Sequence, residues 1–363
     1  MRYIAIAASL LIGISALLVG CSREAEEPVS EPEPEPEQEE IEREPEDPPE
    51  EDRGPFNPFT GLSAPEDSIS RRPIAVVVDN HPAARPQVGL TGADLVFEML
   101  AEGGVTRLMP VYLQEEPEVV GPVRSARPYI LDIALSLDAV LAHCGGSPGA
   151  YRQIENLGME VFNDLWGSGG FFRDPRPGVS YEHTLFTRIT DLRPLMKERG
   201  FEHEEIPPRM WQFDPESPSD AEASQVADEI AIRFPGFGYT ASFRYEEESD
   251  RYLRFTSGAE HLDRDSDEQL AAANVIVMRV ATRVIAGDTE GRLEMDLRGE
   301  GEGLLVAAGW ARDITWKKED LYSPLEFFES SGDGLVMTPG VTWIELAPLN
   351  AEVTVREMNS NGQ

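Results

Sequence analysis

Residues 121–158 read GPVRSARPYILDIALSLDAVLAHCGGSPGAYRQIENLG, and this stretch decides the predicted fold. It predicts a loop, a helix that begins at Pro128, a short buried strand over residues 138–144, a Gly-Gly turn and a second helix. Ser147 is placed to cap the second helix at its N-terminus, and Gly158 to end it. Helices that alternate with buried strands indicate an α/β layer.

Both loops of this stretch carry residues that the fold alone does not require. A strand that leads through a Gly-Gly turn into a helix N-terminus aims backbone N–H groups at one point, which favours an anion. The side chains of Arg124 and Arg127 are expected to reach the same point and to add positive charge. We therefore predict a ligand-binding site whose residues here are Arg124, Ser125, Arg127, His143, Gly145, Gly146 and Ser147.

The flanking sequence predicts further strands and a helix of the α/β layer, followed by a region of short strands. Strands are predicted over residues 74–78, 94–100 and 106–113, and a helix over residues 191–200. From about residue 206 the apolar runs become short and are separated by turn residues, which is typical of antiparallel sheets. We predict an α/β N-terminal domain with a mixed sheet over residues 54–205, and a smaller β-rich C-terminal domain over residues 206–363.

Charged residues follow the first predicted strands of the α/β domain. Ligands of open α/β sheets bind beyond the carboxyl ends of the strands, so these residues join the predicted site. The alternative is that the arginines neutralise the carboxylates in a structural ion-pair network. The site residues added in this way are Asp79, Asn80, Glu98, Glu102 and Arg107. The aromatic loop over residues 162–172 is either a sugar-stacking loop above this site or a loop packed by its own aromatic side chains.

The first 53 residues predict export and membrane anchorage. Residues 1–20 have a basic start and an apolar run, and Leu18-Val19-Gly20-Cys21 closes it as a bacterial lipobox does. Cys21 is then the lipidated N-terminus; an ordinary signal peptide or a transmembrane anchor is the alternative. Residues 22–53 contain 16 acidic residues and 3 arginines, so they predict a disordered acidic tether. The expected location is the extracytoplasmic face of a cell membrane.

Net charge and motif content exclude several partners. The chain carries a formal charge of −36, which disfavours binding to nucleic acid. Asp79, His81, Glu98 and Glu102 are possible metal ligands, but no spacing among them is diagnostic of a metal site. We expect no resident metal and no cofactor.

Several long motifs resemble the YerB-like bacterial lipoproteins, a family of unknown function. The matching segments are RPIAVVVDNHPAARPQ (72–87), ADLVFEMLAEGGVTR (93–107), GPVRSARPY (121–129), HCGGSP (143–148), NVIVM (274–278), ITWKK (314–318) and PGVTWIEL (339–346). The resemblance implies an α/β domain, a smaller β-rich domain and membrane anchorage. It brings no established activity and no catalytic residue.

Three functions remain open at this point. The first is an envelope-associated binding or accessory protein that holds an anionic small molecule or a peptidoglycan fragment at the predicted site. The second is an envelope hydrolase, either a metal-assisted phosphoesterase or a glycan-cleaving enzyme, that uses Asp79, His81, Glu98 and Glu102. The third is a structural partner of wall-synthesis proteins that contacts them through the β-rich domain.

Overall fold

The computed structural model describes residues 54–207, 209–215, 224–236 and 238–358. The predicted signal peptide, Cys21 and the acidic tether lie outside these residues. Among the residues described, none of the helices combines the length and the apolar character needed to cross a membrane.

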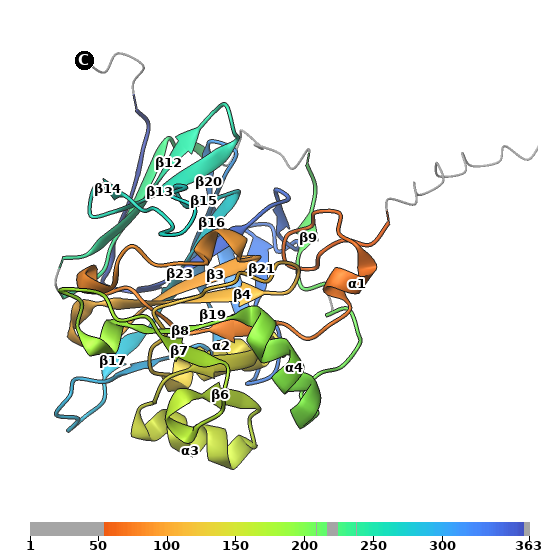
Figure 1. The fold of residues 1–363 in the computed structure, drawn as a ribbon. Helices are drawn as coiled ribbons and strands as arrows, with labels where there is room; N and C mark the ends of the chain where they lie inside the picture. Colours follow the sequence, from red (N-terminus) through yellow and green to blue (C-terminus); the bar gives the residue numbers. More distant parts are fainter. Residues whose placement is uncertain (1–53, 208, 216–223, 237, 359–363) are drawn as a thin grey trace, which may run out of the picture. The chain divides into compact units, whose positions relative to one another are not determined.

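One twelve-stranded sheet receives strands from both halves of the chain (Figure 1). The N-terminal half provides β1 (Ile74–Val76), β2 (Val78–Asp79), β3 (Leu95–Leu100), β4 (Thr106–Tyr112), β5 (Val140–His143) and β6 (Val161–Asn163). The C-terminal half provides β10 (Gln225–Val226), β16 (Asn274–Val280), β19 (Gly299–Ala307), β20 (Trp310–Lys318), β21 (Glu326–Glu329) and β23 (Thr342–Pro348). The strand order is β10-β20-β19-β16-β23-β3-β4-β1-β5-β6, with β2 beside β4 and β21 beside β20.

The two halves meet in the middle of this sheet. Strands β3 and β23 run parallel, with Leu95 opposite Thr342 and Met99 opposite Leu346. Every residue of both strands is buried, as expected for strands that are covered on both faces. The sheet therefore continues across the predicted domain boundary near residue 206.

A six-stranded antiparallel sheet from the C-terminal half packs on the centre of the larger one. Its strands are β11 (Glu229–Arg233), β12 (Thr240–Glu246), β13 (Arg251–Thr256), β14 (Ala259–Glu260), β15 (Ala271–Ala272) and β24 (Glu352–Arg356). Arg254 on β13 bonds to Glu98 on β3 and to Glu345 on β23, which fixes one sheet against the other. Figure 1 shows β12 and β13 on one side of β3 and β4, with α2 on the other.

Helices and three short strand pairs complete the fold. The helices are α1 (Glu66–Ile69), α2 (Pro128–Ser136), α3 (Pro148–Leu157) and α4 (Ile189–Arg199). The strand pairs are β7 (Phe171–Arg173) with β8 (Leu185–Thr187), β9 (Gln212–Phe213) with β22 (Val336–Met337), and β17 (Thr282–Val284) with β18 (Leu293–Met295).

The predicted fold class, an α/β domain with a mixed sheet followed by a smaller β-rich domain, is confirmed. The predicted start of α2 at Pro128 is also found, as are the Ser147 cap and the Gly158 end of α3. The predicted strand over residues 74–78 is divided into β1 and β2, because the Val77 backbone bonds to Ala142 and Arg124 between the two strands.

Candidate functional site

An open pocket of about 350 Å³ lies beside the Gly-Gly turn between β5 and α3. We call it the turn pocket. It is lined by Val123, Arg124, Ser125, Cys144, Gly145, Gly146, Tyr151, Leu165, Arg173, Tyr181, Glu182 and Leu185. The structure therefore brings together four of the predicted site residues, Arg124, Ser125, Gly145 and Gly146, at one concave surface.

Two buried side chains, His143 and Asn163, contact the backbone of the Gly-Gly turn. Gly145 takes a positive φ of 74°, which glycine adopts without strain. The buried imidazole of His143 lies 2.7 Å (Nδ1) from the Gly145 carbonyl oxygen, and the Asn163 side chain accepts the Gly145 N–H at 2.9 Å. Burial lowers the pKa of His143 to about 4, so the ring is neutral and supports the turn from below.

Three backbone donors that were expected to face a ligand are used within the protein. The Gly145 N–H donates to Asn163, and the Ser147 N–H donates to the Ala126 carbonyl at 3.2 Å. The Ala150 N–H donates to the Ser147 hydroxyl at 3.1 Å. These three donors therefore stabilise the turn, and the charged groups that line the turn pocket are side chains.

Two arginines supply positive charge to the turn pocket. The Arg124 Nε lies 2.8 Å from Asp79 Oδ2, and its Nη1 donates to the Glu182 carbonyl at 3.2 Å. Arg173 donates to the Tyr181 carbonyl at 2.8 Å, and its guanidinium lies 3.7 Å from the centre of the Tyr181 ring. Glu182 adds a carboxylate to the same lining, so the pocket offers both signs of charge.

Arg127 does not line the turn pocket, and the expectation that it would meet Arg124 there is wrong. Its Nε and Nη2 donate to the two carboxylate oxygens of Glu102 at 2.5 and 2.7 Å. Burial would raise the pKa of Glu102, but the two hydrogen bonds from Arg127 outweigh burial and lower it. For this pair the structural ion-pair alternative describes the geometry.

Asp79 is the centre of a buried network behind the turn pocket. Its carboxylate is completely buried, forms an ion pair with Arg124, and accepts hydrogen bonds from His183 Nδ1 at 2.7 Å and from the His81 backbone N–H at 2.9 Å. Arg107 approaches it at 3.5 Å. Burial alone would raise the pKa of Asp79, but Arg107 and Arg124 lower it below its usual value. Asp79 therefore stays ionised and orients Arg124.

Asn80 and Glu98 lie in a different buried cluster, between the two sheets. Glu98 accepts from Asn80 at 3.0 Å, from Thr106 at 2.5 Å and from Arg254. Arg254 also donates to Glu345 at 3.0 Å. Burial and the nearby Glu98 raise the pKa of Glu345 well above its usual range. These predicted site residues therefore connect the two halves of the protein and do not reach the turn pocket.

Three residues that line the turn pocket, Arg173, Tyr181 and Glu182, were not predicted from the sequence. Arg173 lies on β7, and Tyr181 and Glu182 lie in the short turn before β8, more than 20 residues after the Gly-Gly turn. Strands β7 and β8 pair as a hairpin, which brings these three residues next to the Gly-Gly turn. The signal available in the sequence was the aromatic loop over residues 162–172, of which Leu165 does line the pocket. Within the described part of the chain, no three His, Cys, Asp or Glu side chains gather as metal ligands.

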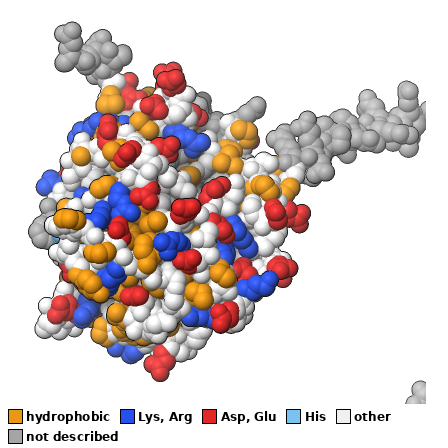
Figure 2. Space-filling view, in the orientation of Figure 1, with side chains coloured by type: hydrophobic (Ala, Val, Ile, Leu, Met, Phe, Trp, Pro, Cys, Tyr) orange, Lys and Arg blue, Asp and Glu red, His pale blue; other side chains and the backbone are white. Residues whose placement is uncertain are grey.

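Charge is also mixed on one face of the molecule. On the face drawn in Figure 2, acidic and basic side chains are interspersed, and no basic patch gathers there.

Comparison with known proteins identifies the class and then the family. Residues 59–202 match the model of the N-terminal domain of a protein of unknown function, DUF3048, and residues 230–344 match the model of its C-terminal domain. A Bacillus subtilis (strain 168) protein named "Putative lipoprotein YerB" is 32% identical over 296 residues, which cover 80% of this chain and 86% of that protein. The crystal structure of YerB from Bacillus subtilis superposes with a TM-score of 0.72 at 29% identity, over 83% of this chain and 100% of that one. The chain belongs to the DUF3048 family of YerB-like proteins, and the predicted resemblance is confirmed.

Proposed function

We propose that this protein is a lipoprotein, anchored through Cys21 on the extracytoplasmic face of a membrane, that binds a peptidoglycan fragment in the turn pocket. The anchorage is supported by the apolar run and lipobox of residues 1–21 and by the name of the Bacillus relative. Two acyl chains on one cysteine suffice for stable attachment. A Cys21→Ala variant should move from the membrane fraction to the soluble fraction, and retention in the membrane fraction would contradict the lipid anchor.

The observation that carries the proposed ligand is the mixed charge of the turn pocket. Arg124 and Arg173 suit a carboxylate, whereas Glu182 suits an amine and repels a simple anion. Peptidoglycan stem peptides contain both groups on one chain and are attached to sugars. The exposed side chains of Leu165 and Tyr181 offer apolar surface to such a sugar. A fragment with a peptide therefore fits better than a free phosphate or sulfate.

Titration calorimetry with a disaccharide-peptide fragment tests the proposal. Arg173 forms no ion pair with a described residue, so Arg173→Gln leaves no carboxylate unpaired, although it removes the contacts to Tyr181, and it should weaken binding about tenfold. Arg152→Gln, an exposed charge change on the neighbouring helix α3, is the matched control and should bind as the parent does. Equal affinities for the parent, Arg173→Gln and Arg152→Gln would contradict binding in the turn pocket.

The envelope hydrolase is the first of the two alternative functions. The carboxylates of the hydrolase alternative are divided, since Asp79 pairs with Arg124, Glu98 with Arg254 and Glu102 with Arg127. Their arrangement gives the hydrolase alternative no support.

A protein partner of the β-rich domain stays a prediction. Because β23 belongs to the same sheet as β3, pull-downs should use surface substitutions on β24 and not a truncation at residue 206.

A further inference from the structure

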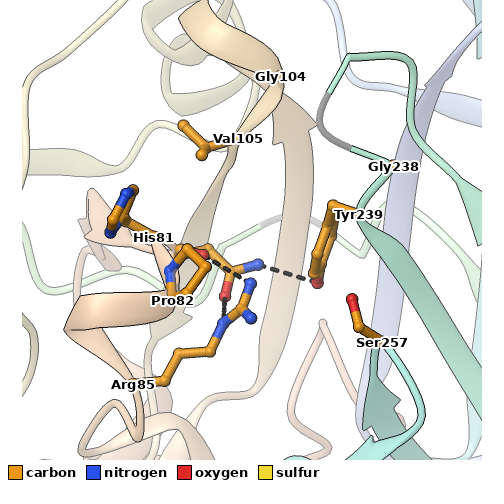
Figure 3. A pocket seen from close by; sticks show the side chains of 9 residues that line it. His81, Pro82, Arg85, Gly104, Val105, Gly238, Tyr239 and Ser257 are labelled. Atoms are coloured by element: carbon orange, nitrogen blue, oxygen red, sulfur yellow. Dashed lines mark hydrogen bonds between the residues drawn. The ribbon is translucent and has the colours of Figure 1, made fainter.

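A second pocket lies where the two halves of the chain meet, and it is separate from the turn pocket. Figure 3 shows this junction pocket, with Arg85 on one side and Tyr239 and Ser257 on the other. Its volume is about 280 Å³, and apolar contact comes from Pro82 and Val105. None of the described residues that line it is acidic, although the chain as a whole carries −36.

The guanidinium of Arg85 has hydrogen-bonding capacity left for a ligand. It donates from Nε to the Asn80 side chain at 3.0 Å and from Nη2 to the Asn80 carbonyl at 2.7 Å. It forms no ion pair with any residue that the structure describes, and burial lowers its pKa. The guanidinium also lies 4.9 Å from the centre of the Tyr239 ring, but this half-buried cation has no carboxylate partner among the described residues, and an anion in the pocket would compensate its charge.

The phenol of Tyr239 also has a free proton. The residue is 8% exposed, and its oxygen accepts from Asn80 Nδ2 and from Arg254 Nη2, each at 3.0 Å. Both partners are donors, so the hydroxyl proton itself has no acceptor among the described residues. Buried hydroxyl groups normally donate as well as accept. A ligand that accepts a hydrogen bond here would complete the network.

Two features of the described backbone shape the edge of the junction pocket. Gly236 approaches Gly104 so closely that an added Cβ would lie 2.6 Å from the Gly104 Cα. Ser257 takes a positive φ of 49°, a conformation that costs free energy for a residue other than glycine. Gly104 and Ser257, which come from the two halves of the chain, therefore border the pocket.

We propose that the junction pocket binds a small monocarboxylate with a short apolar group, a ligand beyond the proposed function of the turn pocket. The carboxylate accepts hydrogen bonds from Arg85 and from the Tyr239 hydroxyl, and its apolar group packs on Val105 and Pro82. One guanidinium and one hydroxyl match a single negative charge, whereas a phosphate dianion needs further donors.

Ligand-observed NMR with the full chain tests this proposal, with butyrate as the probe and butyramide as its neutral isostere. Butyrate should bind with a dissociation constant on the order of 1 mM, as a ligand of about six heavy atoms allows. Butyramide and inorganic phosphate should bind at least about tenfold more weakly. Equal binding of butyramide would overturn the role of charge, and tighter binding of phosphate would overturn the assignment to a carboxylate.

Substitutions at Ser257 locate the site without disturbing the buried network. Asp and Asn both tolerate a positive φ and have nearly the same shape, so both variants should fold. Ser257→Asp should abolish butyrate binding by placing a carboxylate at the pocket, while Ser257→Asn should keep it. Arg85→Gln should weaken it at least about tenfold. Equal binding by the Asp and Asn variants would place butyrate elsewhere, and loss of binding in Arg173→Gln would place it in the turn pocket.

Discussion

Replacing Arg254 by Met tests how the two halves of the protein are joined. The Arg254 side chain is completely buried and donates to Glu98, to Glu345 and to His261. Its guanidinium also lies 4.2 Å from the centre of the Trp343 ring. Methionine fills much of the same space but leaves two carboxylates in a dry interior. Removal of one partner from a buried ion pair costs about 3–5 kcal/mol, and we expect a loss of this size.

Urea unfolding followed by tryptophan fluorescence measures the change. The matched control is Arg244→Met on the neighbouring strand β12, where Arg244 is 41% exposed and pairs with Glu229 at 2.8 Å. Arg244 itself is exposed, and Glu229, although buried, keeps Arg356 as a partner at 3.5 Å, so the loss in Arg244→Met should be about 1 kcal/mol or less. Adding Glu98→Gln to Arg254→Met should recover part of the loss, because one buried charge disappears. If Arg254→Met costs no more than Arg244→Met, the buried pair does not hold the sheets together and the reasoning is refuted.

Two further predictions concern the pH dependence and the backbone. The pKa of His143 is near 4 in the folded protein and near 6.5 when unfolded, so below pH 6.5 the unfolded chain binds a proton that the folded protein does not. The free energy of unfolding should therefore fall by up to about 3 kcal/mol between pH 6.5 and pH 4, and it should fall less in His143→Asn. Urea unfolding at several pH values measures both changes. Equal pH slopes in the parent and in His143→Asn would contradict the buried neutral ring. Gly61→Ala should lower the melting temperature more than Gly258→Ala, because both have positive φ but only at Gly61 would the added Cβ collide with Phe213; calorimetry that ranks them the other way would contradict that contact.

Local sequence signals predicted the elements well. Pro128, Ser147 and Gly158 mark helix ends through short-range chemistry, and the structure places those ends there. Apolar runs likewise predicted β3 and β4 to within about two residues at each end. These signals act within a few residues and do not depend on the remainder of the fold.

Contacts between residues that are far apart in the sequence could not be predicted from these local signals. Glu98 and Arg254 are 156 residues apart, and only the packing of one sheet on the other brings them together. Arg124 and Arg127 are three residues apart, yet they pair with different carboxylates, Asp79 and Glu102. Loop residues close in sequence need not point to the same place, so the predicted meeting of Arg124 and Arg127 was not determined by their spacing.

A crystal structure of the full chain with a bound disaccharide-peptide fragment tests the central claim most directly. We expect a carboxylate of the peptide within hydrogen-bonding distance of Arg124 or Arg173 and an amine beside Glu182. A saturating fragment bound away from the turn pocket, or an empty turn pocket at saturation, would contradict it.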